Sequence, residues 1–285
     1  MRYSKGLASI LLALIFQGCT SLFFYPDRIT YHTPDFYDLA YDDIYFDSTD
    51  KTSLHAWRIY PKAERKGLIF VAHGNAQNLS SHFISWVWLV QEGYELFIFD
   101  YRGYGRSSGK IDLDGSIEDT KAALDYLENM HKSAYFVCGQ SLGASLLINA
   151  MEARDNAKIK AVVLDSAFEG FADIANEKMD QGWVTWPFQW IPYLSLSDKY
   201  DIKNKIAELR KPLLFLHGSS DKIIFPNNSW TLFENAYAPK ELWIVKNAQH
   251  IRSLENENVR KDFVQFLQED KNHFHKSYSR MRVYE

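Results

Sequence analysis

The sequence predicts an α/β protein with a mostly parallel central sheet and helices on both faces of that sheet. Two observations carry this prediction. From Gly67 to Glu269, short apolar runs alternate with amphipathic segments, which is typical of parallel strands that are buried on both faces and joined by helices. Ser, Asp and His residues follow several of these runs directly. Ligands bind at the carboxyl ends of the strands in such sheets, so a site is expected there.

The elements follow in order along the chain. Ile44–Phe46 and Leu54–Tyr60 flank the segment STDKT, which predicts a hairpin. Continuous apolar runs predict strands over Gly67–Ala72, Glu95–Asp100, Ala134–Cys138, Ile159–Leu164 and Pro212–Leu216, with Glu241–Val245 as the last strand. Amphipathic segments predict helices over Leu79–Gln91, Ser116–His131, Ser141–Ala153 and Asn227–Ala236, with Asn256–Glu269 as the last helix.

Length and composition are those of an ordinary globular chain. The 285 residues are 46% apolar and 24% charged, with a formal net charge of −4, which gives no support for nucleic-acid binding. Two cysteines cannot form a disulfide framework, and Cys138 is expected to be buried in a strand. We predict one domain over residues 41–270 and a polar C-terminal tail over 271–285, in which His273 and His275 are solvated.

The first residues have the features of a targeting segment. Arg2 and Lys5 precede the apolar stretch Leu7–Phe16, which is too short to cross a bilayer. FQGC follows, and Gly18 and Cys19 resemble the lipobox of bacterial lipoproteins. We therefore expect a signal peptide over 1–18, lipid attachment at Cys19 and a tether over 19–40. The protein would be exported and membrane-anchored, facing the periplasm or the cell surface. A plain signal peptide and an uncleaved anchor are the alternatives.

The segment GQSLG at residues 139–143 has the G-x-S-x-G pattern of a nucleophile elbow. An apolar strand is expected before it and a helix after it. Its glycines suit a turn so tight that a Cβ on either side of the serine would collide with backbone. Such a turn lifts the hydroxyl of Ser141 clear of the sheet and directs the start of the helix at developing negative charge. Ser141 is therefore the predicted nucleophile.

Taken with four other motifs, GQSLG resembles the Bem46-like branch of the α/β-hydrolases, which is related to serine aminopeptidase-like and acyl-protein thioesterase-like members. The other motifs are HGNAQN at 73–78, DYRGYGRSSG at 100–109, HGSSDKIIFP at 217–226 and AQH at 248–250. The likeness covers about residues 40–270 and implies the α/β-hydrolase fold. It implies that Asp100, Arg102 and Gly103 shape a loop beside the site.

The chain order of this fold is serine, then acid, then histidine. Asp221 follows the strand PLLFL and His250 follows the strand ELWIV, so both lie where a serine hydrolase needs them. Asp221 would fix the tautomer of His250, and His250 would take the proton of Ser141. Asp165, which also ends a strand, is the alternative acid. His217 is expected to pack the turn of Asp221, and His73 to order its own loop.

Acyl transfer also needs two donors for the developing oxyanion. The Leu142 N–H, directly after the nucleophile, is the first. The second is expected from the loop after Gly67–Ala72, where Asn75 is the predicted donor and Ala76 the alternative.

An aromatic insertion interrupts the alternation between Asp165 and Pro212. We predict a lid over about residues 169–211, in which Trp186, Phe188 and Trp190 line an apolar acyl pocket. Packing of these rings onto the core and a membrane-dipping surface are the alternatives, since aromatic side chains serve all three roles.

These features predict a serine hydrolase that cleaves an acyl ester or thioester through an acyl-enzyme on Ser141. The expected substrate is a small-molecule or lipid-like ester, and no cofactor, metal or nucleic acid is expected. A peptidase or amidase that uses the same three residues is the first alternative. A non-catalytic binding protein on the same fold is the second, although such a scaffold has no need of all three residues.

Overall fold

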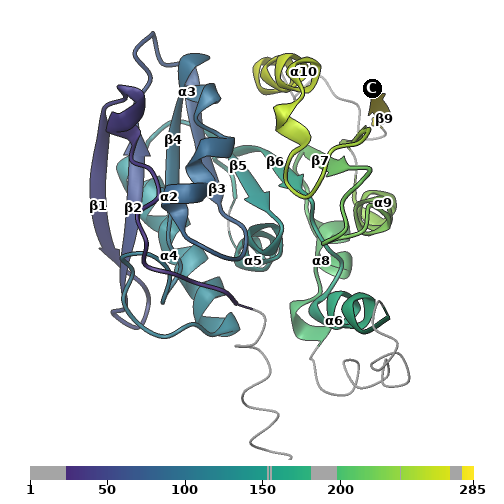
Figure 1. Ribbon diagram of the computed structural model, residues 1–285, viewed down its shortest axis with the longest axis horizontal. Coiled ribbons are helices and arrows are strands. Elements are labelled where there is room, and N and C mark those ends of the chain that lie inside the picture. The colour runs from purple at the N-terminus through teal and green to yellow at the C-terminus, as the bar shows by residue number, and fades with distance from the viewer. Residues whose placement is uncertain (1–23, 153, 155, 181–197, 238, 270–277) are drawn as a thin grey trace, which may run out of the picture.

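A nine-stranded sheet runs through the part of the chain described by the computed structural model, residues 24–152, 154, 156–180, 198–237, 239–269 and 278–285. The strand order is β1-β2-β4-β3-β5-β6-β7-β8-β9. β1 pairs with β2, and β2 with β4, in antiparallel fashion, and every later pair is parallel. The strands are β1 (Tyr41–Asp47), β2 (Ser53–Ile59), β3 (Gly67–Ala72), β4 (Tyr94–Phe99), β5 (Tyr135–Gln140), β6 (Ile159–Asp165), β7 (Leu213–Gly218), β8 (Lys240–Val245) and β9 (Ser279–Tyr284). The predicted α/β class with a mostly parallel sheet is confirmed (Figure 1).

Helices follow most of the parallel strands. The α-helices are α2 (Leu79–His82), α3 (Trp88–Gln91), α4 (Leu113–Met130), α5 (Leu142–Met151), α6 (Phe171–Asp180), α8 (Ile202–Glu208), α9 (Asn227–Asn235) and α10 (Glu257–Gln268). Short 3-10 turns are η2 (Pro34–Tyr37), η3 (Phe83–Ser85), η5 (Asp198–Tyr200) and η6 (Ser253–Glu255). None of the helices in the described ranges has both the length and the apolar character that crossing a bilayer requires.

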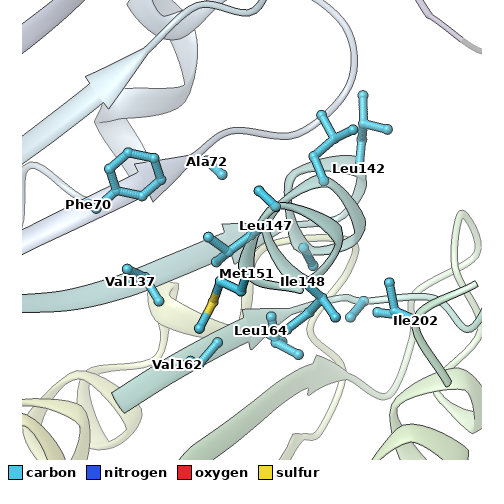
Figure 2. Close-up of a cluster of buried hydrophobic side chains, with 14 of the residues drawn as sticks. Phe70, Ala72, Val137, Leu142, Leu147, Ile148, Met151, Val162, Leu164 and Ile202 are labelled. Atoms are coloured by element: carbon cyan, nitrogen blue, oxygen red, sulfur yellow. The ribbon is translucent and has the colours of Figure 1, made fainter. Parts of the chain in front are cut away.

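Both faces of the sheet are covered, which explains the continuous apolar runs. In β3, Phe70 and Ala72 belong to one buried cluster and Ile69 and Val71 to the other. α4, α5, α8 and α9 contribute to the first cluster, while α2, α3 and α10 contribute to the second. Figure 2 shows the centre of the first cluster, where Leu147 and Met151 of α5 lie over Val137 and neighbouring strand residues. Burial on both faces holds the strands that carry the site.

One predicted helix is broken. Leu79–Gln91 is expected to be a single helix, but α2, η3 and α3 share this stretch. Its middle, FISWVW, is aromatic and β-branched, and such residues favour helix weakly because their χ1 rotamers are restricted there. Burial of Phe83 and Trp86 in the second cluster, and not helix propensity, fixes its path.

The prediction that Glu241–Val245 is the last strand is wrong, because β9 lies parallel to β8 within the predicted polar tail of 271–285. β9 is an edge strand with mostly exposed side chains. Two of its polar residues are paired: the Arg282 guanidinium is 2.6 Å from the Asp262 carboxylate, to which the Tyr284 hydroxyl also donates at 2.9 Å. His273 and His275 lie outside the described residues.

Two other predicted segments pack more closely than expected. The described part of the predicted tether, residues 24–40, lies on the domain, with Phe24 and Leu39 buried. At the end of the predicted lid, α8 buries Ile202 and Ile206 completely in the core, so this part of 169–211 belongs to the helix layer.

Candidate active site

Ser141 lies in a sharp turn between β5 and α5. Its φ of 52° and ψ of −115° are rare for an L-residue. Space requires the two flanking glycines: a Cβ on Gly139 would lie 2.6 Å from the Cα of Ala144, and a Cβ on Gly143 would lie 2.1 Å from the carbonyl oxygen of Ala72. The elbow geometry predicted from the sequence is therefore present, with Ser141 at the first turn of α5.

The three predicted triad residues come together at the carboxyl edge of the sheet. His250 Nδ1 is 2.7 Å from Asp221 Oδ2, and His250 Nε2 is 3.0 Å from Ser141 Oγ. The carboxylate of Asp221 can only accept, so Nδ1–H donates to it. Nε2 is then free to accept the hydroxyl proton of Ser141. This is the geometry in which a histidine can activate a serine hydroxyl.

Asp221 is held as a carboxylate by fixed donors. Its Oδ1 accepts from the N–H groups of Ile223 and Ile224 at 2.8 and 3.0 Å. Burial opposes its ionisation, but hydrogen bonds from His217 and His250 outweigh burial and hold the pKa of Asp221 well below its usual range. An acid with this pKa stays charged while His250 gains a proton.

His217 packs the turn of Asp221, as expected. This fully buried ring is 3.3 Å from Asp221 Oδ2 through Nε2, which also lies 3.0 Å from the carbonyl oxygen of Ile224. Its Nδ1 is 2.7 Å from Ser229 Oγ. These contacts fix the ring from both sides.

Asp165, the alternative acid, makes no hydrogen bond to His250 within the described residues, where the imidazole contacts Asp221 and Ser141. It is fully buried and accepts from the Gln140 amide at 3.1 Å through Oδ2, while Oδ1 has no partner in the described chain. Burial raises the pKa of Asp165 to about 6. The structure thus places Asp221, and not Asp165, against the imidazole.

The loop after β3 brings Asn75 and Ala76 beside Ser141. The Ala76 N–H donates to Asn75 Oδ1 at 2.8 Å, and the same oxygen accepts from the Tyr25 N–H at 3.0 Å and the Tyr104 hydroxyl at 2.8 Å. The Ala76 N–H is thus engaged by a neighbouring side chain, and Asn75 and Ala76 both lie in the wall of the cavity beside Ser141. The first candidate, the Leu142 N–H, stands at the start of α5.

The residues of the DYRG motif shape the loops around the site. Asp100 Oδ1 accepts from the Leu79 N–H at 2.7 Å and lies 3.3 Å from His73 Nε2. Arg102 binds Asp119 through two nitrogens, and Gly103 adopts a φ of 79°. All three shape the loops, in agreement with the prediction.

A cavity of about 480 Å³ opens beside Ser141 and His250. His82 is in its wall, and burial, followed by the interaction with the neighbouring His73 ring, lowers the pKa of His82 to about 4, so the His82 ring is neutral near pH 7. Within the described ranges, the wall has no Asp, Glu, Lys or Arg. Its apolar side chains are Tyr25, Ala76, Leu142, Phe168, Phe171, Ile174, Ile223, Ile224 and Ile251.

Sequence reasoning missed most of this apolar wall. Phe168 and Phe171 follow β6 in DSAFEGF, and Ile223 and Ile224 follow Asp221 in DKIIF. Apolar residues in a loop directly after a reactive side chain were the available signal. The predicted pocket residues Trp186, Phe188 and Trp190, and the predicted lipid site Cys19, lie outside the described residues. In the ranges that the structure covers, no group of three or more His, Cys, Asp or Glu is placed to hold a metal ion.

Comparison with known proteins places the chain in a family. A family described as serine aminopeptidase, S33, matches residues 63–202. YfhR of Salmonella typhi is 33% identical over 85% of this chain and 84% of its own length. Protein bem46 of Schizosaccharomyces pombe is 27% identical over 82% of this chain and 81% of its own length. The chain belongs to the α/β-hydrolases, in their Bem46-like branch.

Solved structures agree on the fold of this hydrolase. The Pyrococcus furiosus esterase Pf2001 superposes with a TM-score of 0.68 over 86% of this chain and 98% of that protein. Its sequence identity to this chain is 22%, so the likeness concerns the fold.

We predict that Asp165→Asn stabilises this α/β-hydrolase at neutral pH. The folded-state pKa of Asp165, about 6, lies above the unfolded value near 3.9. The cost of holding its buried charge is therefore small near pH 4, grows as the pH rises and is complete above about pH 6. The amide avoids this cost and can still accept from Gln140.

Urea unfolding of the wild type and of Asp165→Asn at pH 4.5 and 7.5 tests the predicted pH dependence of this stabilisation. The gain in unfolding free energy should be roughly 2 kcal/mol larger at pH 7.5. An equal gain at both pH values would show that Asp165 is not held with a raised pKa.

Proposed function

We propose that this α/β-hydrolase is a serine esterase or thioesterase that transfers the acyl group of its substrate to Ser141. The observation that carries the proposal is the relay from Asp221 through His250 to Ser141, with distances of 2.7 and 3.0 Å. A serine hydroxyl is weakly nucleophilic until a base receives its proton, and His250 Nε2 is placed to be that base.

The chemistry follows from these positions. Ser141 Oγ attacks the substrate carbonyl carbon as its proton moves to His250 Nε2. The N–H groups of Leu142 and Asn75 stabilise the oxyanion. When the resulting tetrahedral intermediate collapses, the bond between the acyl carbon and the alcohol or thiol breaks. The alcohol or thiol leaves with the proton from His250. Water then attacks the acyl-enzyme carbonyl through the same proton transfers by His250, which releases the carboxylic acid and restores Ser141. Asp221 remains a carboxylate throughout and stabilises the imidazolium.

Substitution of the triad tests this proposal. Ser141→Ala should abolish both hydrolysis of p-nitrophenyl esters and labelling by a fluorophosphonate, because each needs the Oγ nucleophile. Asp221→Asn should lower kcat by several orders of magnitude through loss of the correct tautomer. Asp165→Asn is the matched control and should retain most of the activity. A labelled Ser141→Ala protein, or the reverse ranking of the two aspartates, would contradict these assignments.

The apolar wall of the cavity supports a neutral, apolar acyl group. Phe171, Ile174 and Ile223 offer surface on which each buried CH₂ of an acyl chain gains about 0.8 kcal/mol. The family description favours a second candidate, an aminopeptidase. A free α-amino group would call for a carboxylate, and the described wall has none. We therefore prefer the ester.

Acyl-length profiles test the pocket. With p-nitrophenyl esters from acetate to decanoate, kcat/KM should peak at short to medium chains. Ile174→Trp should move the peak to shorter chains by filling part of the cavity, whereas Val283→Trp, on the exposed edge strand β9, should not. An unchanged profile for Ile174→Trp would place the acyl group elsewhere. Faster cleavage of aminoacyl p-nitroanilides than of any ester would favour the peptidase.

We also propose that the protein is exported and anchored through lipid on Cys19. The support is the sequence alone: a basic start, a short apolar stretch and the pair Gly18-Cys19. Several acyl chains on one cysteine would hold the protein firmly at a membrane. Cys19→Ser should release the protein from the membrane fraction or block its processing. Mass spectrometry of the mature N-terminus decides the matter, since any terminus other than an acylated Cys19 contradicts the proposal.

A further inference from the structure

The first described residues lie against the loop that holds the proposed oxyanion donor. We name residues 24–31 the N-terminal strap and residues 73–78 the β3–α2 loop. Figure 1 shows the strap as the start of the purple segment that runs past α2 towards β1. The side chain of Phe24 is buried in the same core cluster as Leu142, and Tyr25 contributes to the cavity wall. A stretch predicted to be a tether is thus part of the site.

Main-chain hydrogen bonds join the strap to the β3–α2 loop. Pro26 and Gln77 form a parallel bridge. The Gln77 N–H donates to the Tyr25 carbonyl at 3.1 Å, and the Asp27 N–H donates to the Gln77 carbonyl at 3.3 Å. The strap also contacts the loop after β4, because the Asp27 carbonyl accepts a hydrogen bond from the Gly105 N–H at 2.8 Å. The strap therefore connects the loops that follow β3 and β4.

Side chains add a second set of contacts. Asn75 Oδ1 accepts from the Tyr25 N–H at 3.0 Å, which fixes the side chain of the residue whose backbone is the proposed donor. The buried Asn78 amide donates to Asp27 Oδ1 at 2.7 Å and to the Ile29 carbonyl at 2.8 Å. Asp27 thus reaches the loop through both its backbone and its carboxylate.

The β3–α2 loop contains two residues in an unfavourable backbone conformation. Ala76 and Gln77 adopt φ values of 67° and 57°, a left-handed conformation that residues other than glycine disfavour. Two such residues in succession persist only where surrounding contacts impose them. The strap provides those contacts at Asn75, Gln77 and Asn78. An oxyanion donor must also be in place before the reaction, because its effect depends on fixed geometry.

We propose that the N-terminal strap is a positioning element for the oxyanion hole and that Asp27 is its central positioning residue. The inference rests on the proposed esterase function. Asp27 does not touch the substrate. It holds Gln77 and Asn78, and through them the direction of the Asn75 N–H. Loss of this support weakens stabilisation of the transition state and leaves ground-state binding in the apolar cavity largely intact, so kcat falls while KM changes little.

Three variants of the full chain test the proposal. Asp27→Ala removes the carboxylate that accepts from the Asn78 amide, and should lower kcat for p-nitrophenyl butyrate about tenfold or more, with KM within about threefold. Asp27→Asn keeps an acceptor oxygen and should restore most of kcat. Asp35→Ala, an exposed aspartate in η2 of the same region, is the matched control and should leave kcat unchanged.

Amide hydrogen exchange supplies a readout that does not need turnover. Asp27→Ala should speed exchange in peptides covering residues 73–80 and leave the peptides of β5 to β8 as in the wild type. A wild type that cleaves no ester would defeat the proposed function, and exchange alone would then decide the role of the strap. Unchanged exchange in residues 73–80, acceleration spread over the whole chain, or an unaltered kcat in an active enzyme would each overturn the proposal.

Discussion

The close approach of α5 to the end of β3 is the constraint on which the site depends. A Cβ on Gly143 would lie 2.1 Å from the Ala72 carbonyl oxygen, so only glycine lets the first turn of α5 come so near. This approach brings the start of α5, with Ser141 and Leu142, beside the β3–α2 loop that carries Asn75. Two backbone donors from separate loops can serve one reacting carbonyl only at such short range.

At the same edge of the sheet, the surroundings of each carboxyl group, and not its residue type, determine its pKa. Asp165 ends β6 and Asp221 lies in the turn after β7, yet the pKa values of the two carboxyl groups move in opposite directions. Asp221 has donors on both oxygens and remains charged, whereas Asp165 has one oxygen without a partner in the described chain and is shifted towards its neutral form. The carboxylate of Asp221, which accepts from Nδ1–H of His250 at 2.7 Å, favours one tautomer of the imidazole.

The amino-acid sequence alone predicts those parts of the site that lie on the strands of the sheet or directly after them. The alternation of apolar runs predicts the parallel sheet, and the strand-end positions of Ser141, Asp221 and His250 predict that they meet, because parallel strands end at one edge. It was insufficient for β9, whose alternating SRMRVY has one buried side chain and three ion-pairing or exposed polar ones. The wall of the cavity was also missed, since Tyr25 and Phe171 reach it from segments whose paths depend on tertiary contacts and not on periodicity.

The position of the strap links the proposed anchor to the proposed chemistry. Cys19 precedes Phe24 by five positions. Even a fully extended chain of this length spans at most about 18 Å. Tyr25 lies in the cavity wall and is 66% exposed, and Ile223, also in that wall, is 52% exposed. In the proposed lipoprotein the mouth of the cavity therefore stays close to the membrane surface, and apolar side chains surround its opening. An acyl chain leaving a lipid layer would meet apolar surface before it reached Ser141, so a lipid-like ester fits this arrangement better than a substrate dissolved in water.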